Sequence, residues 1–173
     1  GATKYLEFDT GAVGTATGPW NDTEPTSSLF TVGSSYNNTN RVSRNFVSYH
    51  WHNVPGLQKF GTYVGNGNAD GPFVELGFRP AVVLRKSTGG GSGYDWVFID
   101  SVRNTYNIAN TKLYPNRSGK ENVNSDNSDS GDNSAIDILS NGFKVRASNG
   151  RMNANGTTFI YAAWAEAPAS NLF

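Results

Sequence analysis

Short runs in which apolar and polar residues alternate recur along this chain, and a period of two residues is typical of half-buried β-strands. The runs predict strands over residues 4–8, 29–32, 45–52, 60–64, 73–76, 78–84, 94–99, 143–147 and 158–165. The runs at 78–84 and 94–99 are apolar on both sides, and the strand at 78–84 is expected to be covered on both faces, as in the middle of a sandwich. The longest apolar run near the end, 158–165, is expected to form a central strand. No segment keeps helical spacing of apolar residues over three turns, so a long amphipathic helix is not expected.

The run from Asn45 to His52 makes a prediction about orientation. One side of this strand would carry Asn45, Val47, Tyr49 and Trp51, and the other side would carry both histidines. We therefore expect the side with Tyr49 and Trp51 to face the core and the histidines to face outward.

Short strands separated by Gly-rich and Asn-rich connections predict an all-β fold, an antiparallel β-sandwich of jelly-roll type, because such sheets hide their faces and edges by stacking or closing. Four long loops are expected at 11–28, 33–40, 87–93 and 120–134. Loops of this length in a compact domain are commonly functional. The 173 residues are expected to form one sandwich domain over 1–173.

Charge and composition exclude several classes of protein. Fourteen basic residues balance 14 acidic ones, so the broad attraction needed for nucleic acid or an anionic membrane is missing. The apolar runs are far shorter than the roughly 20 residues that cross a bilayer, so no membrane insertion is expected. Because the chain begins at Gly1 and not at Met, we expect a fragment of a longer protein.

No pattern of catalytic residues stands out. Glycoside hydrolysis needs two carboxyl groups at a defined distance, but Glu7, Glu75, Glu121 and Glu166 are scattered along the chain. Glu75 and Glu166 flank core strands, where pairing with arginine is the simpler role. There is no G-x-S-x-G elbow and no Cys, so a nucleophilic enzyme is not expected either. We therefore expect a protein that is not an enzyme.

Two groups of residues could ligate a metal. His50 and His52 project from one side of the predicted strand, and a dimer or trimer would gather them into an iron site. In the loop that follows Lys120, Asp126 and Asp137 bracket a weak calcium-loop spacing that lacks its final Glu. The alternatives are histidines that bind nothing and a solvated loop bonded to its own backbone, in which case no cofactor is present.

Three aromatic residues lie in or beside the predicted loops, namely Trp20, Tyr36 and Tyr94. Aromatic faces next to amide groups are typical of shallow sugar-binding sites. The alternative is that the three rings cover the ends of the sandwich.

Five blocks of the sequence carry a resemblance. They are KFGTYVGNG (59–67), GFRPA (77–81), WVFIDSVR (96–103), LSNGFK (139–144) and IYAAWAEAP (160–168). In this order they resemble a domain of tailed-bacteriophage tail fibre and tail structural proteins. The resemblance covers residues 49–168, while residues 1–48 match less clearly. The blocks supply turn and strand residues, with Asn141-Gly142 a type I′ hairpin signal.

The resemblance implies a virion protein of the phage tail, located in the extracellular particle and assembled with other virion proteins. It implies a receptor-binding domain that contacts a host-surface glycan or protein, as a homo-oligomer with three copies favoured. Two alternatives stay open. One is a purely structural virion module such as a collar, decoration or connector, and the other is a glycan-degrading tail enzyme.

Overall fold

The computed structural model describes residues 2–8, 13–34, 37–89, 94–118, 121, 135–148 and 150–166. The chain divides into two compact units, which are described separately. Unit 1 comprises Gly1–Glu7 and Ala12–Trp51, and unit 2 comprises Phe8–Gly11 and His52–Phe173. Within the described ranges, no helix has the length and apolar character needed to cross a membrane.

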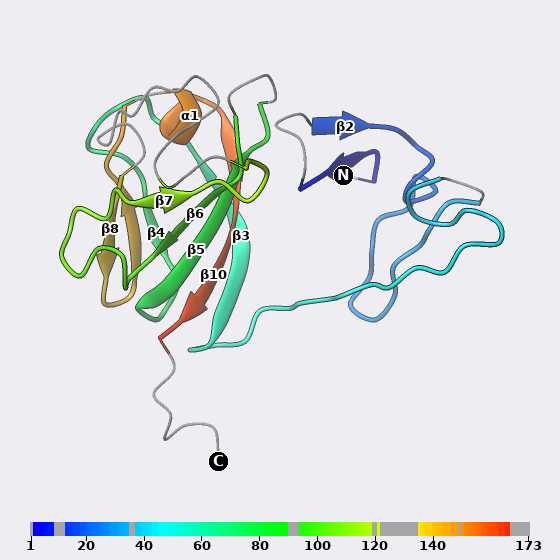
Figure 1. Cartoon of the computed structure of the whole chain (residues 1–173), viewed down its shortest axis with the longest axis horizontal. Helices are drawn as coiled ribbons and strands as arrows, with labels where there is room; N and C mark the ends of the chain where they lie inside the picture. The colour runs from blue at the N-terminus through cyan, green and yellow to red at the C-terminus, as the bar shows by residue number, and fades with distance from the viewer. Residues whose placement is uncertain are drawn as a thin grey trace, which may run out of the picture. The chain divides into compact units, whose positions relative to one another are not determined.

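Unit 2 contains a five-stranded antiparallel sheet (Figure 1). From one edge to the other its strands are β3 (Gln58–Val64), β10 (Thr158–Ala165), β5 (Pro80–Ser87), β6 (Val97–Asp100) and β7 (Lys112–Leu113). Strand β10 lies inside the sheet between β3 and β5, as the sequence predicted for 158–165.

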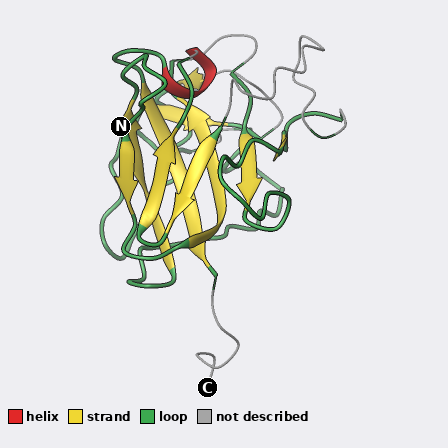
Figure 2. Ribbon diagram, turned by 90° about the vertical axis from the view of Figure 1, so that its left-hand side faces the viewer, coloured by secondary structure: helices red, strands yellow, loops and turns green. Residues whose placement is uncertain are grey.

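A three-stranded antiparallel sheet forms the second layer of unit 2. Its order is β4 (Phe73–Glu75), β9 (Gly142–Val145) and β8 (Ile136–Leu139). The predicted all-β fold with antiparallel sheets is confirmed, and the two sheets of unit 2 give it a sandwich-like arrangement (Figure 2).

Aromatic rings join the two sheets in the core. Phe143 of β9 is fully buried and makes edge-to-face contacts with Tyr63 of β3 and Tyr161 of β10, at centroid distances of 6.1 and 5.7 Å. Tyr63 also stacks on Phe159 of β10 at 5.0 Å. Offset and edge-to-face arrangements at these distances are favourable beyond the area that they bury. The period-two pattern of β10 is thus realised, with Phe159, Tyr161 and Ala163 buried.

The hairpin between β8 and β9 shows why Gly142 is needed there. Leu139 pairs with Gly142, so the turn consists of Ser140 and Asn141. Neither residue has a positive φ, so the predicted type I′ turn is wrong. A Cβ atom on residue 142 would lie 2.1 Å from the backbone oxygen of Val74, which is why only glycine fits where β4 and β9 meet.

A buried asparagine ties the loop after β3 to the short helix α1 (Gly150–Asn153). The Nδ2 atom of Asn153 lies 2.8 Å from Asn66 Oδ1, 2.7 Å from the Asn68 carbonyl and 2.8 Å from the Ala147 carbonyl. Its Oδ1 accepts from the Asn66 amide. Because Asn153 is fully buried, these bonds replace the water that its amide loses on folding.

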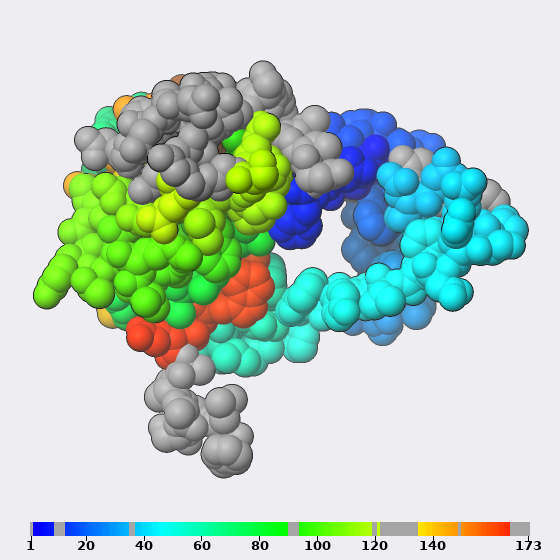
Figure 3. Space-filling view, viewed as in Figure 1, coloured from blue at the N-terminus to red at the C-terminus, as the bar shows by residue number. Residues whose placement is uncertain are grey.

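Unit 1 contains one hairpin, in which β1 (Lys4–Leu6) pairs antiparallel with β2 (Val13–Thr15). The predicted strands at 29–32 and 45–52 are not formed, since neither segment pairs with a neighbour. All residues from 41 to 53 are exposed, and Figure 3 shows this cyan stretch as a narrow row of atoms on the face in view. Strands β2, β7 and β8 and helix α1 were missed by the sequence analysis.

Candidate functional site

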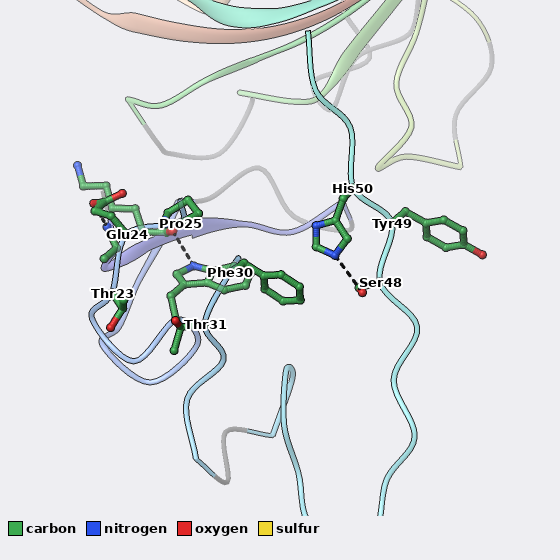
Figure 4. A pocket seen from close by; sticks show the side chains of 11 residues that line it. Thr23, Glu24, Pro25, Phe30, Thr31, Ser48, Tyr49 and His50 are labelled. Atoms are coloured by element: carbon green, nitrogen blue, oxygen red, sulfur yellow. Dashed lines mark hydrogen bonds between the residues drawn. The ribbon is translucent and has the colours of Figure 1, made fainter. Parts of the chain in front are cut away.

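The candidate site is a cavity of about 580 Å³ in unit 1 (Figure 4). Its walls come from β1, from the loop that follows β2 and from the exposed segment before Trp51. The lining residues are Ala2, Lys4, Trp20, Thr23, Glu24, Pro25, Phe30, Thr31, Ser48, Tyr49 and His50. Aromatic rings beside a few hydroxyl and charged groups are typical of small-molecule sites.

Local hydrogen bonds hold the loop that carries most of this lining. The buried carbonyl of Pro19 accepts from the Gly33 amide at 3.1 Å and from Thr39 Oγ1 at 3.2 Å. The indole Nε1 of Trp20 donates to the Lys4 carbonyl at 3.1 Å, which fixes the ring against β1. A Cβ atom on Gly33 would lie 1.7 Å from the Gly18 oxygen, so this close approach of two backbone segments requires glycine.

Phe30 and His50 face each other across one part of the cavity (Figure 4). Their ring centroids are 4.4 Å apart with an angle of 41° between the planes. The His50 Nε2 atom lies 3.0 Å from Ser48 Oγ. Figure 4 shows Tyr49 pointing away from Phe30, and the Tyr49 residue is 75% exposed.

The predicted orientation of this segment is therefore wrong. His50 points toward Phe30, whereas Tyr49 and Trp51, expected to face the core, are among the most exposed aromatic residues. The alternation exists, but no second sheet lies beside this segment to bury its more apolar side.

The charged groups of the cavity are Lys4 and Glu24. Glu24 Oε1 accepts from the Ala2 amide at 2.6 Å, which places a carboxylate next to the first residues of β1. A charge of each sign at one rim gives the cavity both a donor and an acceptor for a polar ligand.

Of the three aromatic residues predicted to bind a ligand, Trp20 lines the cavity. Tyr94 belongs to unit 2, where its carbonyl accepts from Lys86 Nζ at 2.6 Å. Tyr36 lies outside the described residues. Phe30, Thr31 and Glu24 also line the cavity, but no pattern in the sequence marked them as ligand-binding residues. Glu24 lies in the predicted loop 11–28.

The structure describes three of the four residues that were predicted as metal ligands. His50 lies against Phe30, and the His52 carbonyl accepts from Gln58 Nε2. Asp137 of β8 pairs at 3.4 Å with Arg146, which directly follows β9, and Asp126 lies outside the described residues. Within the described part of the chain, no group of three or more His, Cys, Asp or Glu residues could hold a metal ion.

The scattered glutamates make separate contacts. Glu166 lies 3.6 Å from Arg79 and Glu121 lies 2.9 Å from Arg103, as an ion pair in each case. Glu75 was expected to pair with arginine, but its contact is between its own backbone carbonyl and Lys59 Nζ at 2.8 Å. The remaining glutamate, Glu7, accepts from Asn38 Nδ2 at 3.3 Å.

Unit 2 buries charged groups in its core. Arg85 is 1% exposed, donates to the Arg151 carbonyl at 2.9 Å and lies over the ring of Phe159 at 5.7 Å. Burial lowers the pKa of Arg85 and of Lys86, because a buried cation loses hydration. Burial also raises the pKa of Tyr63, against the opposing charge of Arg85. These groups join the sheet to α1, since Arg85 donates to the Arg151 carbonyl and Tyr63 donates to the Met152 carbonyl.

The fold defines an all-β protein with antiparallel sheets and one large surface cavity among the described residues. The chain belongs to the family described as Domain of unknown function (DUF7483), whose model matches residues 1–168. No curated protein matches the chain, and no solved structure does. The family match includes unit 1, so the cavity lies inside the region that defines the family.

Proposed function

We propose that this protein is a receptor-binding domain of a bacteriophage virion, part of a tail fibre, that binds a host-surface glycan or protein reversibly and without catalysis. The observation that carries the proposal is the cavity in unit 1, in which Trp20 and Phe30 lie beside hydroxyl groups and one charge of each sign. A sugar ring offers an apolar face to such rings and hydroxyls to such polar groups. The resemblance of residues 49–168 to tail fibre domains supplies the biological setting.

In this proposal, unit 2 supports the domain and unit 1 binds the receptor. Unit 2 is the rigid part, since its sheets are joined through buried aromatic contacts such as Phe143 with Tyr161. Unit 1 presents its lining residues from loops, where binding residues are concentrated in many proteins. Several copies in one virion would strengthen weak individual sites, because later contacts form at high effective concentration.

Binding of the labelled full chain to a panel of bacterial cells and of purified surface polysaccharides tests this proposal. Phe30→Ala removes one wall of the cavity from an exposed loop position and should weaken binding about tenfold, the equivalent of about 1.4 kcal/mol. Tyr106→Ala is the control, because Tyr106 is an 85% exposed ring of unit 2 that does not line the cavity.

Two outcomes count against the proposal. Absence of binding to every cell and polysaccharide of a broad panel contradicts receptor recognition. Equally strong binding by Phe30→Ala and Tyr106→Ala would mean that the cavity is not the binding site. Shortening of a polysaccharide by the chain would favour the enzyme alternative.

A structural virion module is a second candidate, favoured by a different observation. Unit 1 exposes several large apolar residues, among them Val42, Val47, Tyr49 and Trp51. Exposed apolar groups that gather in one segment are typical of protein interfaces. The same chain can carry both a receptor site and such an interface.

A further inference from the structure

Residues 45–51 run as an extended segment (Figure 1) that pairs with no other strand in the described part of the chain. The segment runs extended, and among the described residues its backbone amides and carbonyls make no hydrogen bond within the chain. An extended segment with free donors and acceptors is the edge to which another strand adds.

The side chains of the same segment are exposed. Val47 is 79% exposed, Tyr49 75% and Trp51 60%. Aromatic side chains each cover roughly 150–250 Å², so the exposed apolar surface of this segment amounts to several hundred Å² per chain. Exposed apolar surface of this extent in one segment is typical of protein interfaces.

The sequence of this segment is self-complementary about Ser48. In an antiparallel pair of two copies centred on this residue, Val47 would lie opposite Tyr49 of the second copy and Phe46 opposite His50. Asn45 would lie opposite Trp51. Val47 thus lies next to an aromatic ring, the rings of Phe46 and His50 lie opposite each other, and the small Ser48 lies opposite itself at the twofold axis, as an isologous contact requires.

We propose that residues 45–51 pair with the same residues of a second copy of this chain, as antiparallel strands related by a twofold axis. Phe30 already covers His50 from within each chain, so one face of the resulting two-stranded ribbon is packed by both copies. The other face joins Val47, Tyr49 and Trp51 of the two copies into one apolar surface. The formal net charge of zero leaves no overall repulsion between the copies.

The mass of the full chain in solution is the first test. Light scattering or sedimentation should give twice the 18.6 kDa of one chain, with dissociation on dilution. A monomer at all concentrations overturns the proposal and leaves the segment free for a different protein. A trimer, the state that the resemblance implies, overturns it as well, since three copies around an axis do not form this contact.

Single cysteines then test the register, because the chain has no cysteine of its own. At the twofold axis the Cα atoms of residue 48 would be about 4.5–5.5 Å apart, within the span of a disulfide. The two copies of residue 52 would lie roughly 27 Å apart, at about 3.4 Å per residue. Under mild oxidation, Ser48→Cys should give a linked dimer and His52→Cys should not. Equal cross-linking of both, which indicates parallel strands, or of neither, contradicts the proposal.

A charge placed in the apolar face tests the energetics. Tyr49→Arg should raise the dissociation constant of the dimer at least about tenfold, since each guanidinium group would lie opposite the apolar Val47 of the other copy and diagonally next to the second guanidinium group. Tyr106→Arg is the matched control, because Tyr106 is equally exposed but belongs to unit 2. An equal effect of both variants, or none of either, overturns the proposal. The mass is measured without a glycan, so this result is separate from the receptor proposal.

Discussion

Two segments of this protein have sequences that predict a strand, but they lie in different surroundings. Strand β10 pairs with β3 on one side and with β5 on the other, and its Phe159 is fully buried. Residues 45–51 pair with no strand among the residues that the structure describes, and Tyr49 is 75% exposed. The comparison shows that alternation gives a segment two distinct faces, whereas burial of one face depends on neighbours that the segment does not supply.

The largest expected effect tests the buried side of this comparison. Phe159→Ala removes a ring that stacks on Tyr63 and lies beneath Arg85, and it should lower the free energy of unfolding by about 3–5 kcal/mol. Chemical denaturation of dilute protein measures the change. Tyr49→Ala, in residues 45–51, is the control, and its free energy of unfolding should change by less than about 0.5 kcal/mol. Similar losses for both substitutions would mean that residues 45–51 are packed in the monomer.

A smaller loss of stability is expected when the buried hydrogen bonds of Asn153 in unit 2 are removed. Asn153→Ala leaves the Asn66 side-chain oxygen and the carbonyls of Asn68 and Ala147 without their common donor, which should cost about 2–3 kcal/mol. Asn40→Ala, at an exposed position of unit 1, should change the free energy of unfolding by less than about 0.5 kcal/mol. A neutral Asn153→Ala would show that water replaces the amide there.

The smallest effect concerns a surface ion pair and has a pH dependence. A hydrogen bond from Lys144 and its charge, followed by the charge of Arg146, lower the pKa of Asp70. Because the folded value lies below the unfolded value of about 3.9, the contribution of Asp70 is fully present above that pH and is lost as the pH falls through the folded pKa. The difference in unfolding free energy between wild type and Asp70→Asn should therefore be constant near neutral pH and vanish in acid.

Asp22→Asn is the matched control for this last prediction. Asp22 is exposed, and no basic side chain forms an ion pair with it among the described residues. Asp22→Asn therefore removes a surface carboxylate without breaking an ion pair between described residues. A flat profile for Asp70→Asn would mean that the ion pair with Lys144 contributes nothing to stability, as is common for exposed pairs.

Much of unit 2 followed from its sequence. The range 158–165 predicted β10 to the residue, and 60–64 and 73–76 came within two residues of β3 and β4. The predictions for these segments agree with the structure because their apolar side chains pack in the core between the two sheets. Strand β7 was missed, since two residues carry no period and Lys112, which is 2% exposed, has no apolar side chain to mark burial.

The candidate site was predictable only in part. Trp20 was singled out as an aromatic residue in a loop, and it lines the cavity. Phe30 was assigned to a strand, and His50 was assigned to a metal because of its spacing from His52. Nothing in the local pattern indicates that His50 would lie 4.4 Å from Phe30, a residue 20 positions earlier in the chain.

The sequence alone determined that this protein is built from short antiparallel strands, because side-chain alternation and the turn residues between runs act over a few positions. The tertiary structure decided which alternating segments gain a partner, which glycines are required where backbones meet, and which loop residues share a cavity. Those outcomes depend on contacts between residues far apart in the chain, such as Gly142 with Val74 and Asn153 with Asn66. No local pattern records such distances, since they arise only when the sheets pack.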